Sequence, residues 1–286
     1  MDSHEWKIVY QAIKVMDRRI ERHMRKCTYS DRLIVAMHLW AVAHDRPMSW
    51  ACRRTSYGGC FRPRQLPSNS QFSRRLRSQR VQQLLQAVHE HLAQTKRTAE
   101  VAYIDGRGFR VGNYTKDPQA RRGWAAGGLA KGYRLHAWAT PDGRIPLWCV
   151  TGLDVDERDV AAVFAEMAPP VDLLLADGLY DSNRLYDRYR QRDICLLTPF
   201  FHPGAGRGHR RHSPGRLAAI QAWPHLGRYV FRDRLEIERV FGHQACCGGG
   251  LGPLPGFVRR LPRVRRWIGA KLILYHARLI KRRTVA

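Results

Sequence analysis

The fold of this chain is decided by two apolar runs that each end in an aspartate: Val101-Ala102-Tyr103-Ile104-Asp105 and Val171-Asp172-Leu173-Leu174-Leu175-Ala176-Asp177. Short apolar runs with little polar alternation are typical of strands that are buried on both faces of a sheet. A third acidic residue, Glu238, lies inside the segment 234–241, whose pattern indicates a helix. Because ligands of open α/β sheets bind beyond the carboxyl ends of strands, we expect these three carboxylates to converge.

Three convergent carboxylates predict a metal site that acts on phosphodiesters. Two Mg²⁺ ions about 3.5–4 Å apart activate the attacking oxygen and stabilise the leaving oxygen. Mg²⁺ prefers hard carboxylate oxygens, and we expect Mn²⁺ to substitute for it. Asp105, Asp177 and Glu238 are therefore the candidate catalytic residues and metal ligands. Two alternatives remain at this level: an Asp-Gly pair is also an ordinary turn, and the pattern hardly separates Glu238 from Glu236.

The charge of the chain predicts a polyanionic partner. Its 286 residues include 50 Lys and Arg against 24 Asp and Glu, a formal net charge of +26. No fold requires such an excess, and nucleic acid is the commonest partner that compensates for it, although a solvated basic surface is the alternative. No stretch approaches the roughly 20 apolar residues of a membrane span, so no membrane partner is expected. The seven cysteines form no ladder of C-x-x-C pairs, and we interpret them as free thiols in a reducing cytoplasm.

The first 97 residues show the periodicity of helices only, and we interpret 1–97 as a helical DNA-binding region. Ser30-Asp31 and Ser68-Asn69-Ser70 are typical N-caps. A short basic helix after a turn, within 49–80, has the organisation of a helix-turn-helix. Its exposed face would supply DNA contacts, and an ordinary arginine-rich surface is the alternative reading. The candidate contacts are Arg74, Arg75, Arg77 and Arg80.

Residues 98–286 predict an α/β catalytic domain that includes the C-terminal helix. Strands are expected at 101–105, 133–140, 145–151, 171–176 and 194–198, with helices between and after them in the order of a ribonuclease-H-like mixed sheet. The Pro141-Asp142-Gly143 turn predicts a hairpin, and Asp159 is expected to cap a helix. The basic loop 201–216 is a candidate DNA contact through Arg207, Arg210 and Arg211, with a plain mobile loop as the alternative.

Several of these segments resemble the DDE transposases of bacterial insertion sequences. Ile104-Asp105-Gly106 is similar to the first-aspartate strand, and Ala176-Asp177-Gly178-Leu179-Tyr180 to the second-aspartate motif. Lys131-Gly132-Tyr133-Arg134-Leu135-His136 resembles the basic strand between them, with Arg134 in a lysine position. Arg234 and Glu238-Arg239-Val240-Phe241 resemble the glutamate helix. Together the motifs cover roughly 98–245 in the expected order, which raises Glu238 above Glu236.

The resemblance implies a ribonuclease-H-like fold, two divalent cations, and cleavage followed by strand transfer at the inverted repeats of an element. It also implies DNA contacts at Lys131, Arg134, Arg234 and Arg239, a homodimer that pairs two DNA ends, and a place at the nucleoid. There are departures: Phe231 replaces a common tyrosine, and Ala245 a common lysine. The alternatives are a transposase-derived DNA-binding protein that no longer cuts, and another ribonuclease-H-like nuclease.

Overall fold

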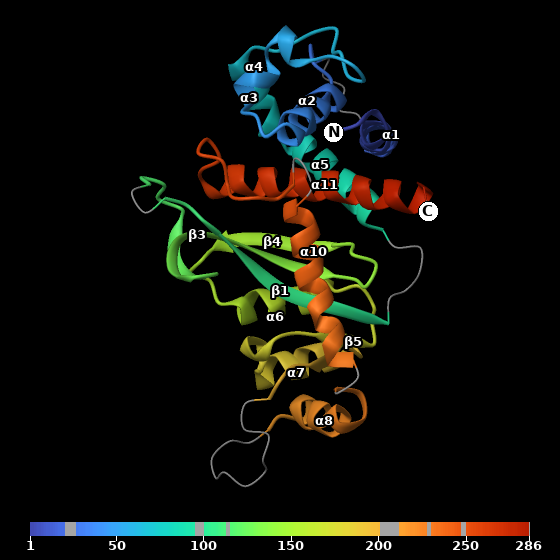
Figure 1. Cartoon of the computed structure of the whole chain (residues 1–286), viewed down its shortest axis with the longest axis vertical. Coiled ribbons are helices and arrows are strands. Elements are labelled where there is room, and N and C mark those ends of the chain that lie inside the picture. Colours follow the sequence, from blue (N-terminus) through green and yellow to red (C-terminus); the bar gives the residue numbers. More distant parts are fainter. Residues whose placement is uncertain are drawn as a thin grey trace. The chain divides into compact units, whose positions relative to one another are not determined.

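The computed structural model describes residues 1–20, 27–94, 100–112, 115–200, 212–227, 230–246 and 250–285. The chain divides into two compact units by its internal contacts. Unit 1 consists of Met1–Gln94 and His243–Ala286, and unit 2 of Thr95–Gly242 (Figure 1). The chain thus leaves the first unit after Gln94 and returns to it at His243.

Unit 1 is helical in its described part, as predicted for the N-terminal region. Polar N-caps start three of its helices: Asp2, Ser30 and Ser68 each accept a hydrogen bond from the first turn, and Ser68 forms a complete capping box with Gln71. The helices are α1 (Ser3–Arg19), α2 (Asp31–Ala43), α3 (Met48–Ala51), α4 (Asn69–Leu76), α5 (Gln79–Ala93) and α11 (Leu261–Val285), with a 3₁₀ turn, η1, at Arg54–Ser56.

The core of unit 1 is an aromatic cluster. Trp6 contacts Trp40 with ring centroids 5.0 Å apart in an edge-on arrangement, and Phe61 at 4.8 Å. Trp40 also donates from its indole nitrogen to the Ser56 carbonyl at 3.0 Å, so its one polar atom is satisfied. These contacts hold α1, α2 and the segment after α3 together.

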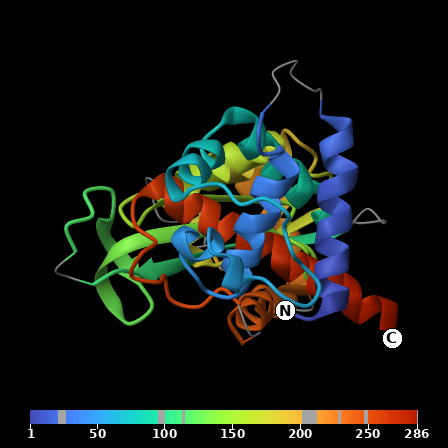
Figure 2. The same cartoon turned by 90° about the horizontal axis from the view of Figure 1, so that it is seen from above.

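The C-terminal helix packs on the N-terminal helices, whereas the sequence analysis assigned it to the catalytic domain. α11 contacts α1, α2 and α5 within unit 1. Its residues from Trp267 to Ala277 are almost all buried, and a helix that is apolar around most of its circumference needs neighbours on several sides. Lys281 near its end pairs with Asp2, which brings the two ends of the unit together (Figure 2).

Two of the arginines predicted to contact DNA have structural partners. Arg75 on α4 and Arg80 on α5 both pair with Asp31 at the start of α2, at 2.6 and 2.5 Å, and all three side chains are largely buried. Arg74 and Arg77 are exposed. The pairing of Arg75 and Arg80 therefore joins three helices, and only Arg74 and Arg77 of this set extend into solvent.

Unit 2 is built on a mixed six-stranded sheet, which confirms the predicted fold class. Neighbouring strands follow the order β2-β3-β1-β5-β6, and β4 also pairs with β3. β1 pairs antiparallel with β3 and parallel with β5, which in turn pairs parallel with β6. The strands are β1 (Val101–Arg110), β2 (Arg121–Ala125), β3 (Gly128–Ala139), β4 (Leu147–Gly152), β5 (Leu173–Leu175) and β6 (Cys195–Leu197).

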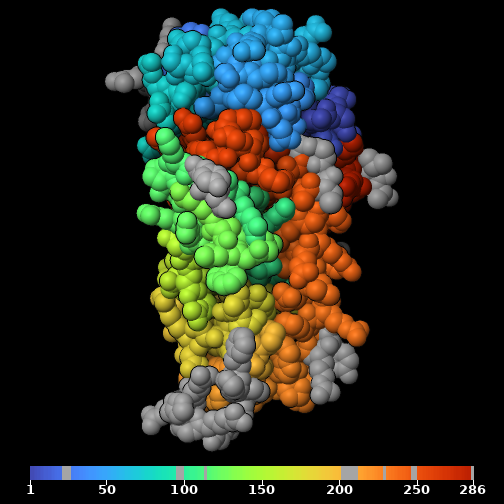
Figure 3. All heavy atoms as spheres, turned by 60° about the vertical axis from the view of Figure 1, so that its left-hand side comes forward, coloured from blue at the N-terminus to red at the C-terminus, as the bar shows by residue number. Residues whose placement is uncertain are grey.

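One strand was not predicted. β2 forms a hairpin with the outer half of β3, and its residues Arg121-Arg122-Gly123-Trp124 have neither an apolar run nor a regular alternation. The hairpin is exposed (green in Figure 3), with Trp124 71% and Leu129 64% accessible. A polar edge strand depends on pairing with its neighbour rather than on burial, and therefore leaves little trace in the sequence pattern.

Helices surround this sheet, and α10 runs across β1 in Figure 1. They are α6 (Glu157–Met167), α7 (Asn183–Arg190), α8 (Pro214–Ala222) and α10 (Leu235–Cys246), with short turns η2 (Gly178–Tyr180), η3 (Trp223–Gly227) and η4 (Phe231–Arg234). The prediction that Asp159 caps α6 was wrong, because Asp156 is the N-cap and accepts from the Arg158 amide. Asp181 pairs with the buried Arg216 at 2.7 Å. No helix of the described segments is long and apolar enough to span a bilayer.

Candidate active site

Asp105 and Asp177 lie at equivalent points of two neighbouring parallel strands. Tyr103 of β1 is in register with Leu175 of β5. Each aspartate follows its strand partner by two residues, so both side chains leave the sheet at the same level. Asp105 remains within β1, opposite Ala137 of β3, and Asp177 begins the turn η2 by accepting the Leu179 amide at 2.9 Å. The register thus places together the two carboxylates that the sequence predicted.

Burial changes the chemistry of Asp105. Removal from water raises the pKa of this carboxyl group to about 7, and the negative charges of Asp177 and Glu157 act in the same direction. The Gly106 amide, which donates to Asp105 at 2.7 Å, and the positive charge of Arg234 act against this rise. No cationic side chain of the described residues lies within salt-bridge distance of Asp105. A cation at this position would relieve the repulsion between the two aspartates.

Glu157 is a further acidic residue at this site, and the sequence analysis did not identify it. It lies in the first turn of α6 and pairs with Arg134 of β3 at 2.6 Å, both side chains being mostly buried. Tyr180 donates its hydroxyl to Glu157 at 3.0 Å, and burial raises the pKa of the Glu157 carboxyl group. A β-carbon at Gly106 would lie 2.2 Å from Glu157 Oε2, so only glycine lets this carboxylate approach β1 so closely.

The glutamate helix is attached to β1, but Glu238 is not beside the two aspartates as a third ligand. Arg107 of β1 donates to the Phe241 carbonyl of α10 at 2.9 Å. Arg234, whose charge acts on Asp105, donates to Glu238 Oε1 at 3.4 Å, and the Glu238 side chain is 56% exposed. The positive charge of Arg234 therefore acts on both Glu238 and Asp105. Glu236 pairs with Arg239 instead.

The donor set of the two aspartates fits a hard divalent cation. Asp105 and Asp177 supply carboxylate oxygens, the ligands that Mg²⁺ takes with retained waters. Within the described segments, no three His, Cys, Asp or Glu side chains are grouped closely enough to hold a metal ion. The structure thus brings together two of the three residues that the sequence predicts as ligands.

A cleft of about 840 Å³ opens beside Glu157 and the residues that follow Asp177. Three of its lining residues are arginines, Arg122, Arg134 and Arg158, and two are the exposed apolar residues Trp124 and Leu179. Four carboxylates, those of Asp154, Asp156, Glu157 and Asp181, also line it, and Arg134 and Arg158 pair with two of them. The cleft is therefore mixed in charge, and its exposed aromatic and apolar groups suit the base faces of a nucleic acid strand. Of the predicted contacts that the structure describes, only Arg134 lines this cleft.

The other predicted DNA contacts lie elsewhere. Lys131 donates to the Thr115 carbonyl at 3.2 Å, and Arg239 extends from α10 into solvent while it pairs with Glu236. Arg207, Arg210 and Arg211 lie outside the described residues. Arg216, at the end of the predicted basic loop, is buried against Asp181 and is not available to DNA.

Comparison with known proteins decides the family. Residues 96–248, more than half of the chain, match the family described as transposase DDE domain. The chain belongs to this transposase family. No curated protein and no solved structure gave a match. The matched segment contains Asp105, Asp177 and Glu238, and the mixed sheet of unit 2 is the ribonuclease-H-like core of the DDE domain.

Membership of the transposase family gives the site its context. Transposases act on DNA, and DDE domains in general use divalent metal ions, which agrees with the carboxylate pair formed by Asp105 of β1 and Asp177 after β5. In this transposase burial disfavours the charge of the first aspartate, and a bound cation would stabilise that charge.

We predict that the stability of the metal-free transposase falls as pH rises because of Asp105. The folded pKa of about 7 lies above the value of 3.8 for a free side chain. The stability that the protonated Asp105 contributes to the folded state is therefore fully present below about pH 4 and is lost as pH rises through 7. Asp105→Asn does not titrate, so its stability relative to wild type should increase between pH 5 and 8 by a few kcal/mol. Chemical unfolding in EDTA measures this.

The matched control for this experiment is Asp172→Asn. Asp172 is exposed at the opposite end of β5, and its substitution removes the same negative charge. It should follow the pH dependence of the wild type. A difference between Asp105→Asn and wild type that stays constant from pH 5 to 8 would show that Asp105 is ionised throughout.

We also predict that Glu157 stabilises unit 2 through Arg134. Glu157→Gln leaves a mostly buried guanidinium without a counter-charge, which should lower the free energy of unfolding by about 1–3 kcal/mol. Asp159→Asn is the matched control, because Asp159 forms an exposed pair with Arg184. This substitution should change the free energy of unfolding by less than about 0.5 kcal/mol. Urea unfolding at neutral pH compares them, and equal effects would contradict the assignment.

Proposed function

We propose that this protein is an insertion-sequence transposase, which binds the terminal inverted repeats of its element, cleaves DNA strands there and transfers the freed ends to target DNA. The observation that supports the proposal most is the parallel register of β1 and β5, which brings Asp105, within β1, and Asp177, just after β5, to the same level of the sheet. Family membership supplies the reaction class. The excess of 26 positive charges supplies the attraction for DNA.

In this proposal Asp105 and Asp177 hold the divalent cations, with Mg²⁺ the expected ion and Mn²⁺ able to replace it. Bound cations would lower the pKa of the attacking oxygen and stabilise the leaving oxygen. Glu238 would complete the ligand set by exchanging its contact with Arg234, a contact that is long at 3.4 Å and largely exposed. Such a contact contributes well under about 1 kcal/mol, so its loss opposes the exchange only weakly.

The remaining residues of the site position DNA and balance charge. Arg134 is held by Glu157 at the wall of the cleft, where its fixed guanidinium can donate hydrogen bonds to a phosphate. Trp124 and Leu179 offer apolar surface to a base. We propose double-stranded DNA as the partner, a homodimer in the complex of paired ends, and a cytoplasmic, nucleoid-associated location that follows from this partner.

The test is a cleavage assay on DNA that contains the two ends of the element, with Mg²⁺ or Mn²⁺. Asp177→Asn should lose at least about a hundredfold in cleavage, because one metal ligand is removed. The control Asp172→Asn removes the same charge from the far end of β5 and should cleave like wild type.

A second pair of variants tests the glutamate helix in the same assay. Glu238→Gln should abolish cleavage, while Glu236→Gln, two residues away and paired with Arg239, should retain it. If the wild type binds the ends and cuts with neither metal, the chain is a DNA-binding protein derived from a transposase. Metal-dependent cleavage of branched DNA without preference for the ends would favour another ribonuclease-H-like nuclease.

A further inference from the structure

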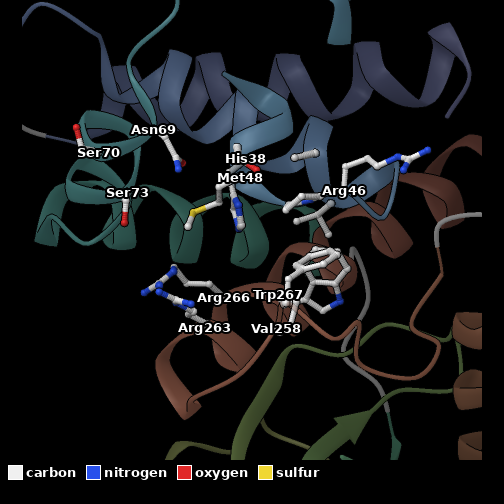
Figure 4. A pocket seen from close by; sticks show the side chains of 15 residues that line it. His38, Arg46, Met48, Asn69, Ser70, Ser73, Val258, Arg263, Arg266 and Trp267 are labelled. Carbon is white, nitrogen blue, oxygen red and sulfur yellow. The ribbon is translucent and has the colours of Figure 1, made fainter. Parts of the chain in front are cut away.

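Unit 1 contains a pocket of about 470 Å³ that the proposed chemistry of unit 2 does not use. Its walls come from α2, α3, α4, the segment before α11, and α11 itself (Figure 4). His38 points into it from α2, Asn69 and Ser73 face it from α4, and Arg263 and Arg266 extend into it from α11. Polar groups from separate parts of the sequence therefore converge on one cavity.

His38 is the clearest indication that the pocket accepts a ligand. His38 is only 6% exposed, and its one hydrogen bond is to the backbone of Arg266, which leaves the other ring nitrogen without a partner among the described residues. Burial lowers the pKa of the imidazole to about 4, and the charge of Arg266 acts in the same direction. The ring is thus neutral near pH 7, and its second nitrogen is free to bond to a molecule in the cavity. Unsatisfied buried polar groups are uncommon, and a bound molecule satisfies them.

The positive charge at the pocket has no internal compensation. Burial lowers the pKa of Arg266, and repulsion from Arg263 and Arg77 adds to this effect. Neither Arg263 nor Arg266 has a carboxylate within salt-bridge distance among the described residues, and the segment 243–286 contains no Asp or Glu at all. The described carboxylates of unit 1 that form ion pairs do so elsewhere, at Asp2, Glu5, Asp17, Asp31 and Asp45. An anion is the missing counter-charge.

Aromatic and apolar side chains also line the pocket. Trp267 and Phe257 contact each other edge-on with ring centroids 5.5 Å apart, and Phe257 is 41% exposed. Met48 adds a thioether next to His38 (Figure 4). An accessible aromatic ring next to an anion site offers a stacking surface for a planar base, and the volume exceeds what a phosphate group alone would fill.

From these features we propose that the pocket binds one nucleotide unit. Arg263 and Arg266 contact its phosphate, Phe257 and Trp267 its base, and His38 and Asn69 supply hydrogen bonds. The nucleotide comes either from solution as a free mononucleotide or from a DNA strand as an unpaired residue, and both sources present the same phosphate and base. The site concerns unit 1 alone and does not depend on the cleavage proposed for unit 2.

The fluorescent base 2-aminopurine tests this directly, because stacking on an aromatic ring quenches its emission. The probes for the full-length protein are the free 2-aminopurine deoxynucleoside 5′-monophosphate, the nucleoside without phosphate, and a duplex ending in one unpaired 2-aminopurine nucleotide. We expect quenching with at least one phosphate-bearing probe, and at least about tenfold weaker binding of the nucleoside. Quenching by the free nucleotide or by the duplex alone identifies the source.

Arg266→Gln should weaken this binding at least about tenfold, whereas Arg18→Gln should change it less than about twofold. Arg18 is exposed on α1, so its replacement removes the same charge from unit 1 without altering the pocket. Arg266→Gln should not lower the unfolding temperature, since it removes repulsion from Arg263 and Arg77. If that variant is less stable, Arg263→Gln at an exposed position replaces it.

Three outcomes would overturn the proposal. They are no quenching of either phosphate-bearing probe up to about 1 mM, equal binding of nucleoside and nucleotide, and equal effects of the substitutions at Arg266 and Arg18. The cleavage assay with Asp177→Asn is independent of all three. A negative result for nucleotide binding therefore leaves the proposed transposase chemistry intact. A negative result in the cleavage assay likewise leaves the nucleotide pocket intact.

Discussion

The chemistry of unit 2 depends on the burial of one carboxylate, Asp105, next to a second one, Asp177. The parallel pairing of β1 and β5 fixes Asp105 and Asp177 at the same level, and the core of the sheet buries the first of them. Burial disfavours the charged form of Asp105 most, and the negative charge of Asp177 adds to this effect, so the pKa of Asp105 rises to about 7. A divalent cation removes the conflict without a change of fold, and this is the physical reason for connecting the pair with metal-dependent chemistry.

The groups around the pair limit this repulsion in different ways. Glu157 adds negative charge but is neutralised by Arg134 and held by Tyr180. Arg234 supplies positive charge near Asp105 from the start of the glutamate helix, while its guanidinium contacts Glu238. The site thus keeps one arginine fixed at the cleft and another on a weak, exposed contact. That difference suits a fixed phosphate contact at Arg134 and an exchangeable one at Arg234.

Sequence predicted the parts of the site that depend on local pattern. Asp105 and Asp177 end apolar runs, and a strand that is buried on both faces is recognisable from composition. Glu157 was missed because Asp156, Glu157 and Asp159 are similar residues at the start of one helix, and only the packing of α6 against β1 determines which of them enters the site. The strand β2 was missed because an exposed edge strand has no apolar pattern.

The basic residues were the least predictable, because a charge count does not indicate the partner of each charge. Arg75 and Arg80 share Asp31, and Arg216 is buried with Asp181, acids that are distant in the sequence. The assignment of α11 failed for a related reason: an amphipathic pattern shows that a helix needs a surface but not which unit supplies it. The predicted resemblance covered the DDE region and therefore gave no information on unit 1, where the nucleotide pocket lies.

The most direct test of the central claim is binding of Mn²⁺ measured by the loss of its free-ion electron paramagnetic resonance signal. The account predicts that wild type and Asp172→Asn bind Mn²⁺ equally, and that Asp105→Asn and Asp177→Asn each weaken binding at least about tenfold. Equal Mn²⁺ binding by all four proteins would contradict the claim that Asp105 and Asp177 form the metal site.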